Sequence, residues 1–244
     1  MLHGLGRDFA LALRRLLATP LFAAFAVLSL AVGVGVTTAV YSVVESIFWK
    51  DTGIVDPRTL VFVTAPDDAR QRAARLSRPD YIDLLAAQKS FVAFGAAQQV
   101  QVAAALPSKT ELLAAEAVSG DYFRTLGVRA SSGRLIEPRD DEAAAPVVVL
   151  SEAMWRKRFN ADGQIIGRSL RLSGQAFEII GIAQKPFQGT DARGPFSTGL
   201  WVPLATAASL APRRDPGPGR AQPVISARDR RSLVVAGRLR SRHR

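Results

Sequence analysis

The chain has 244 residues, a formal net charge of +11 and no cysteine. The absence of cysteine excludes disulfides, thiolate chemistry and cysteine-ligated zinc. The charge does not indicate nucleic-acid binding, because residues 212–244 carry +8 of it, from ten arginines and two acidic residues, with no aromatic side chain among them to stack on bases.

Residues 1–19 predict an amphipathic helix that lies on the cytoplasmic membrane interface. Apolar side chains recur there at helical spacing, and arginines occupy other faces. The apolar set is Leu2, Leu5, Phe9, Leu13, Leu16 and Leu17, and the basic set is Arg7, Arg14 and Arg15. A frayed basic tail is the alternative interpretation.

Residues 20–48 predict a transmembrane helix. No Asp, Glu, Lys or Arg occurs from Leu16 to Val44, a run of 29 residues. About 20 apolar residues suffice to cross a hydrocarbon core about 30 Å thick, because a helix rises about 1.5 Å per residue. Pro20 suits the first helical turn. A cleaved secretory signal would have a shorter apolar stretch, and a buried core helix would keep a broader polar stripe.

The charges on either side of this helix predict its orientation. Basic residues favour the cytoplasmic side. Three arginines and one acidic residue precede the helix, whereas the charges that follow it nearly cancel: Arg7, Arg14, Arg15 and Asp8 before it, Glu45, Lys50 and Asp51 after it. We therefore expect a single-pass protein of the bacterial inner membrane, with a cytoplasmic N-terminus and a periplasmic main domain.

Small residues inside the helix predict a face that packs against other helices. Ala31, Gly35 and Ala39 recur every four residues, with Ser29, Gly33 and Thr37 on an adjacent face. Small side chains let two backbones approach closely within a membrane. The candidate packing residues are Ala31, Gly33, Gly35 and Ala39, and the alternative is that small residues are simply common in such helices.

Residues 49–211 predict a mixed α+β domain of short strands and helices. Ser77 and Asp80 have capping-box spacing, Gly127 suits a left-handed helix end, and Ser173-Gly174 suits a hairpin turn. Predicted strands cover Leu60–Ala65, Phe91–Leu106, Glu111–Val118, Pro146–Leu150, Ser169–Leu172, Ala176–Ile182 and Leu200–Leu204, and predicted helices follow Ser77, Gly120 and Ser151. Residues 212–244 predict a Pro/Arg-rich excursion, a last strand at Leu233–Leu239 and a basic tail.

The motifs of common enzyme classes are missing. No phosphate-binding G-x-x-x-x-G-K-[ST] sequence occurs, and the two histidines, His3 and His243, lie in the basic head and tail. We expect no catalytic, metal or cofactor site. An acidic cluster is interpreted as a solvated turn beside Arg134 and Arg139 rather than a calcium site, because the ordered ligand spacing is absent. Its members are Glu137, Asp140, Asp141 and Glu142.

A family resemblance covers nearly the whole chain. The head and first span are similar to the first transmembrane segment of MacB-type (FtsX-type) ABC transporter permeases, and more narrowly resemble acidobacterial orphan permeases. The exported part resembles the MacB-like periplasmic core domain. The residues that carry the resemblance are Arg7–Leu16, Pro20, Leu28–Gly35, Thr37–Ala39, Tyr41–Val44, Ser77–Tyr81, Val118–Phe123, Leu126–Val128, Gly133, Arg134, Pro146–Ser151, Trp155, Phe159, Ile166, Gly167 and Trp201–Leu204.

The resemblance implies a role in ATP-driven transport without bond chemistry in this chain. A separate cytoplasmic ABC ATPase would bind ATP, and the periplasmic domains of two permease copies would open or close on a substrate or an adaptor protein, for efflux or envelope transport. Family members continue past the stretch resembling Val234–Leu239 into further membrane helices, so we expect this chain to be an N-terminal part of a permease. The alternative function is a single-span, membrane-anchored binding or sensor module without an ATPase.

Overall fold

The computed structural model describes residues 20–48, 53–67, 72–190, 198–210 and 231–240. The chain divides into two compact units, Met1–Lys50 and Asp51–Arg244. The predictions made for residues 1–19, for most of the Pro/Arg-rich excursion and for the last four residues of the tail lie outside the described residues.

The first unit contains α2 (Pro20–Phe48), a helix of 29 residues at the positions predicted from the sequence. Its part Pro20–Ser42 has a mean hydropathy of 2.1 and is, among the described residues, the one helix long and apolar enough to cross a membrane. The hydroxyls of Thr37 and Thr38 donate to the carbonyls of Gly33 and Val34 at 2.8 Å. These polar groups are therefore satisfied within the helix, as apolar surroundings require.

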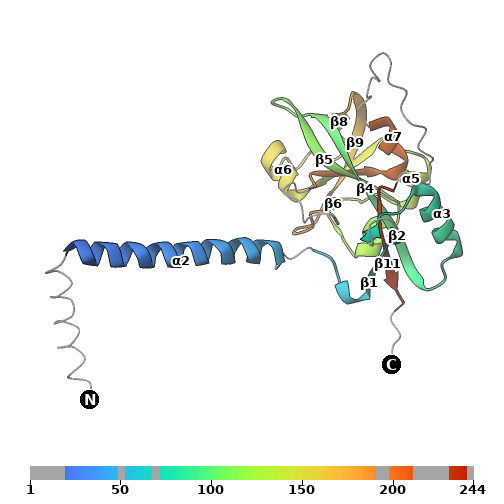
Figure 1. Ribbon diagram of the computed structural model, residues 1–244. Coiled ribbons are helices and arrows are strands. Elements are labelled where there is room, and N and C mark those ends of the chain that lie inside the picture. Colours follow the sequence, from blue (N-terminus) through green and yellow to red (C-terminus); the bar gives the residue numbers. More distant parts are fainter. Residues whose placement is uncertain (1–19, 49–52, 68–71, 191–197, 211–230, 241–244) are drawn as a thin grey trace, which may run out of the picture. The chain divides into compact units, whose positions relative to one another are not determined.

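The second unit is a β-rich domain with short helices (Figure 1). Its strands are β1 (Leu60–Val63), β2 (Ala65–Asp67), β3 (Arg72–Ala74), β4 (Phe91–Ala105), β5 (Thr110–Val118), β6 (Ala130–Gly133), β7 (Val147–Ser151), β8 (Ser169–Leu172), β9 (Gln175–Ala183), β10 (Leu200–Pro203) and β11 (Leu233–Leu239). Its helices are η1 (Pro57–Thr59), α3 (Arg78–Ala87), α4 (Tyr122–Leu126), α5 (Pro138–Glu142), α6 (Glu152–Phe159), η2 (Leu204–Thr206) and α7 (Ala207–Leu210).

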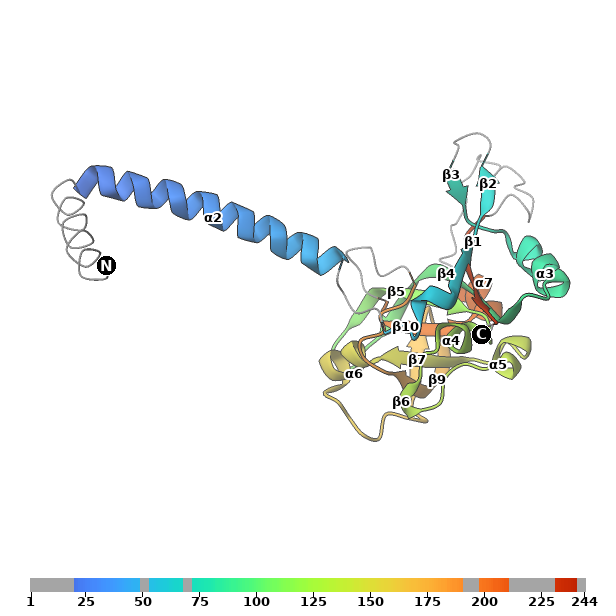
Figure 2. The same cartoon turned by 90° about the horizontal axis from the view of Figure 1, so that it is seen from below.

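Six strands close into a ring. The pairing runs β4-β5-β10-β7-β9, and β8 joins β9 back to β4 through the pair Ala104 and Leu172. The pairs β5-β10 and β7-β9 are parallel, and the other pairs of the ring are antiparallel. β11 and then β1 extend the sheet from β4, and β6 extends it from β9. β2 and β3 form a separate hairpin (Figure 2).

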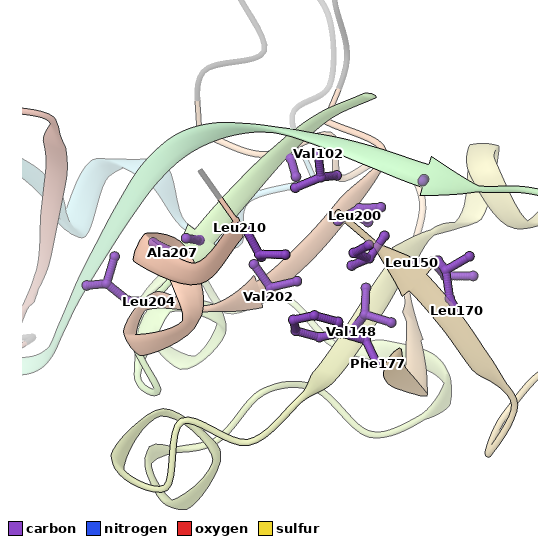
Figure 3. Close-up of a cluster of buried hydrophobic side chains, with 14 of the residues drawn as sticks. Val102, Val148, Leu150, Leu170, Phe177, Leu200, Val202, Leu204, Ala207 and Leu210 are labelled. Atoms are coloured by element: carbon purple, nitrogen blue, oxygen red, sulfur yellow. The ribbon is translucent and has the colours of Figure 1, made fainter. Parts of the chain in front are cut away.

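Alternate residues of the ring strands form the main core. Val148 and Leu150 of β7 belong to a buried cluster that receives side chains from all six strands, whereas Val147 and Val149 belong to a second cluster on the opposite face. Successive side chains of a strand point to opposite faces of the sheet, so β7 is buried on both. Figure 3 shows the main cluster, where Leu204, Ala207 and Leu210 of η2 and α7 also pack.

The structure confirms the α+β fold class with one apolar N-terminal helix. Ser77 and Asp80 form the predicted capping box at α3, and Gly127 ends α4 with a φ of 70°. Ser151 accepts from the Met154 amide at the start of α6. Ser173 and Gly174 join β8 to β9 with φ values of 48° and 87°, which suits a tight hairpin turn.

The sequence-based prediction differs from the structure at several points of the second unit, because β6, α5, η1, η2 and α7 were not predicted and two strands were mistaken. The predicted strand Leu60–Ala65 is two elements, because β1 ends at Val63 and β2 begins at Ala65 to pair with β3. β3 was not predicted, since the sequence RAA lacks the β-branched and aromatic residues typical of strands. The hairpin depends on pairing between the two segments, which composition alone does not reveal.

Candidate functional site

The predicted packing residues of α2 lie on two sides of the helix. Residues two positions apart are turned by about 200°, so Gly33 lies nearly opposite Gly35 rather than on an adjacent face. A shallow groove on α2 is lined by Ser29, Leu30, Gly33, Val34, Thr37 and Thr38. Of the four candidates, Gly33 alone lines it, and a Cβ added at Gly33 or Gly35 would have open space. Their role in helix packing stays a prediction.

The first and the last described strands of the second unit are neighbours in the main sheet. β1, the first strand after α2, pairs antiparallel with β11, the last described strand, and Leu60 is registered with Arg238. β11 pairs in turn with the first half of β4, from Phe91 to Gln98. The start of β1 and the end of β11 therefore lie side by side at one end of the sheet (Figure 1).

A carboxylate is buried at the centre of the domain. Glu116 of β5 is 1% exposed and accepts hydrogen bonds from the Tyr122 hydroxyl at 2.7 Å and the Trp201 indole N–H at 2.8 Å. The Thr190 amide also donates to it at 3.1 Å. Burial, together with the Glu116 charge, raises the pKa of Tyr122 well above its ordinary value. The carboxylate is closed to solvent, so it serves to join β5, α4, β10 and the segment at Thr190.

Aromatic rings surround this carboxylate on the second core cluster. Phe123 meets Trp201 edge-on at 5.7 Å between ring centroids, and Phe187 stacks on Trp201 at 5.2 Å. Tyr122 packs edge-on against Phe123 at 5.2 Å. Such ring pairs add about 0.5–1.5 kcal/mol each beyond the area they bury. The cluster is thus a rigid support under the sheet, and it was not predicted from the sequence.

Two members of the acidic cluster, Asp140 and Asp141, are not solvated, which corrects the sequence-based interpretation for them, whereas Glu137 and Glu142 are exposed as predicted. Asp140 is 5% exposed and accepts two hydrogen bonds from the Arg134 guanidinium, at 2.6 and 2.9 Å. Burial alone would raise the pKa of Asp140, but the bonds from Arg134 and the Glu137 amide lower it below its ordinary value. Asp141 accepts from the Ala205 amide at 2.8 Å, and burial raises its pKa. Asp141 thus joins α5 to η2, and Asp140 joins α5 to Arg134.

No metal site is formed by the side chains that the structure describes, since no group of three His, Asp or Glu residues is placed to hold an ion. Two acids of the cluster form ion pairs instead, Glu137 with Arg139 at 3.1 Å and Asp140 with Arg134. The described part of the domain consists of a closed ring of strands, a second core cluster on the other face of the sheet, and the neighbouring strands β1 and β11.

Comparison with known proteins decides the family. A family model described as the MacB-like periplasmic core domain matches residues 23–237. The chain belongs to this family. The match begins within α2 and ends within β11, so it includes both the strand that enters the MacB-like domain and the strand that leaves it.

One curated relative is the "Macrolide export ATP-binding/permease protein MacB" of Chromobacterium violaceum, which is 32% identical over 92 residues. The match covers 38% of this chain and 14% of that protein, so the chain spans a small part of its relative's length. The family is that of ABC transporter permeases, which are transporters rather than classical enzymes.

Two solved structures share the fold. The periplasmic region of MacB from Actinobacillus actinomycetemcomitans is 17% identical, with a TM-score of 0.53, and the match covers 80% of this chain and 79% of that one. The extracellular domain of the noncanonic ABC-type transporter YknZ from Gram-positive bacteria is 14% identical, with a TM-score of 0.51 over 75% and 84% of the two chains. The chain therefore shares its fold with both solved structures.

Sequence reasoning missed the role of Glu116 and that of Arg238, whose guanidinium donates hydrogen bonds to Thr125, Thr59 and Val55. A signal for Glu116 existed, because it is one acid within the run LLAAEAV of a predicted buried strand. Arg238 likewise follows the apolar run LVVAG of β11. A charged residue in such a run either faces solvent or has partners, and only coordinates distinguish the two.

Proposed function

We propose that this chain is part of a permease subunit of a MacB-type ABC transporter, in which the β-rich domain is inserted between α2 and later membrane helices. The pairing of β1 with β11 carries the proposal, because it brings the two ends of the domain side by side. A domain with this arrangement can be placed between two membrane helices without spanning the distance between remote ends. Membership of the MacB-like family supports the same role.

We assign the chain to the bacterial inner membrane, with α2 across the bilayer, the N-terminus in the cytoplasm and the β-rich domain in the periplasm. The support is the apolar stretch Pro20–Ser42 and the excess of arginine before it. Positive residues on the cytoplasmic side of a span set its orientation.

The proposed partners are a cytoplasmic ABC ATPase, a second permease copy and a periplasmic adaptor or substrate protein. The name of the Chromobacterium relative joins ATP binding and a permease in one protein, whereas this sequence lacks the phosphate-binding loop. The ATPase would bind and hydrolyse ATP, and this chain would pass the resulting motion to the periplasmic side. The process served would be efflux from the cell or transport within the envelope.

Purification from native membranes with a mild detergent tests this proposal. We expect an ABC ATPase to copurify with the tagged chain or with the longer protein of which it is part. We also expect its ATP hydrolysis rate to change when the permease is added to the purified ATPase. If no ATPase is retained even after chemical crosslinking, the permease assignment is contradicted, and the membrane-anchored binding or sensor module takes its place.

A further inference from the structure

Arg238, at the end of β11, contacts three separate segments of the chain. Its Nε donates to the Thr125 carbonyl at 2.7 Å, and one terminal nitrogen donates to the Thr59 hydroxyl at 2.9 Å. The other terminal nitrogen donates to the Val55 carbonyl at 2.7 Å. The guanidinium thus joins the outgoing strand β11, the last turn of α4 and the segment 53–59 through which the chain arrives, called here the incoming segment.

Other contacts hold the incoming segment at the same place. The Val55 amide donates to the Leu126 carbonyl at 3.1 Å. Gly127, which ends α4, leaves little room, because a Cβ added there would lie 2.8 Å from the Val55 Cβ. The last carbonyls of α4 lack partners within the helix, and Arg238 and Val55 supply two of them. The incoming segment therefore lies directly on the end of α4.

The chemistry of the side chain explains why an arginine occupies this position. A guanidinium offers five N–H donors in one rigid plane, so one group can donate to three acceptors from different segments. A lysine ammonium is a compact point donor and cannot reach acceptors that lie on opposite sides of a planar fork. Arg238 is half-buried, so its hydrogen bonds to Thr125 and Thr59 are partly shielded from competing water, whereas the bond to the Val55 carbonyl is exposed.

Without Arg238 the incoming segment would be held much less firmly. β1 pairs with β11 over four residues and has no second neighbour among the described strands. An edge strand of this length contributes few hydrogen bonds. Because α4 is a helix outside the sheet, a side chain of β11 must make the connection to it. The pairing of β1 with β11 already joins the incoming segment to the outgoing strand, and the bonds of Arg238 connect α4 to both.

We propose that Arg238 locks the incoming segment, the outgoing strand and α4 into one rigid base, so that a displacement of the chain at residue 53 moves the sheet instead of being absorbed by a hinge. Arg238 acts here as a positioning residue. The importance of this base for transport rests on the proposed permease function, whereas its rigidity is a property of the chain alone and is tested without an ATPase.

Hydrogen exchange of the full chain in lipid nanodiscs tests the rigidity. In the R238A variant we expect exchange of the Val55 and Thr59 amides to rise at least tenfold, and R238K should not restore protection. The Val148 and Ile179 amides of the ring should keep their wild-type rates, which shows that the variant is folded. The matched control is R134A, which removes another arginine that donates three hydrogen bonds and should leave Val55 unchanged. Unchanged exchange at Val55 and Thr59 in folded R238A would overturn the proposal.

A distance measurement adds a readout that mere loss of stability would not move. Because the chain has no cysteine, spin labels can be placed uniquely at R58C and Q175C, both on exposed positions. We expect a narrow distance distribution in the Arg238 background and a broad one in R238A, measured where both variants are fully folded. Equal widths would contradict a rigid base.

The link to transport has its own outcome. In a complex that retains the ATPase, R238A should still bind the ATPase. The change that the permease causes in the rate of ATP hydrolysis should be at least five times smaller with R238A than with the wild type. If no ATPase binds the wild type, the permease function fails while the exchange result still decides the rigid base. If ATPase binds and its response to R238A equals the wild-type response, the base is not part of the coupling.

Discussion

α2 and the β-rich domain differ in where their apolar side chains lie. The large apolar side chains of α2, such as Leu21, Leu30 and Val36, are 58–75% exposed, whereas Leu150, Leu200 and Trp201 in the domain are fully buried. The domain satisfies its apolar and polar groups from its own sequence, but α2 requires apolar surroundings from outside. The described core of the domain is therefore formed within this chain, whereas the apolar side chains of α2 are left exposed by it.

The largest expected effect compares a leucine of each region. Leu150→Ala removes a side chain from the centre of the ring and should lower the free energy of unfolding by about 2–5 kcal/mol. Leu30→Ala, on α2, should leave that free energy unchanged because Leu30 does not contribute to the domain core. Urea unfolding of the full chain in detergent, followed by tryptophan fluorescence, measures both. Equal effects of the two variants would contradict the separation of the two regions.

A second comparison tests the buried carboxylate. Glu116→Gln replaces one acceptor oxygen by an NH₂ group, which must then face the N–H or O–H donors of Tyr122, Trp201 or Thr190. Leaving such a buried donor unsatisfied costs about 1–3 kcal/mol. Glu178→Gln, at an exposed position of β9, is the control and should change the melting temperature little. A stable E116Q protein would show that the network does not hold the domain together.

The Arg134–Asp140 pair predicts a loss of stability in acid. Because the folded pKa of Asp140 lies below its ordinary value, its stabilisation is present above about pH 4 and disappears as pH falls through the folded pKa. Asp141, whose pKa burial raises, has the opposite effect on stability, because protonation in acid removes the cost of burying its charge. Asp140→Asn should cost about 1–2 kcal/mol at neutral pH. Melting temperatures from pH 7 to pH 2.5 should converge for wild type and variant, and a constant difference would refute the assignment.

The smallest effect on the domain, but a clear one on assembly, is expected for α2. Gly33→Leu fills the groove and should leave the unfolding of the domain unchanged, since open space surrounds that position in this chain. It should reduce copurification of partner helices severalfold if the groove receives one. Gly35→Leu, on the nearly opposite side, distinguishes the two faces. Copurified protein per tagged chain is the measurement, and equal recovery for both variants and wild type would remove both faces from consideration.

Local signals in the sequence predicted much of the fold. The capping residues Ser77 and Ser151, the left-handed Gly127 and the apolar run of β7 act within a few residues of themselves, so their effect can be read directly. Closure of the ring depends on one pair, Ala104 and Leu172, which are 68 positions apart, and no local pattern specifies it.

The roles of Glu116 and Arg238 could not be assigned for the same reason. Glu116 meets Trp201 across 85 positions of the sequence, and Arg238 meets Val55 across 183. The sequence marks each as a charge in an apolar run, but only the fold supplies its partners. The packing residues of α2 remain predictions, because the partners that would test them belong to other helices.

We propose that α2 crosses the membrane and that the β-rich domain folds outside the cytoplasm. Lys109, 63% exposed at the turn between β4 and β5, offers the most direct test because the chain has no native cysteine. We expect K109C in intact spheroplasts to react with a membrane-impermeant maleimide, whereas R7C, ahead of the helix, should react only after the membrane is opened. Protection of K109C together with labelling of R7C from outside would show the opposite topology and contradict the proposed orientation.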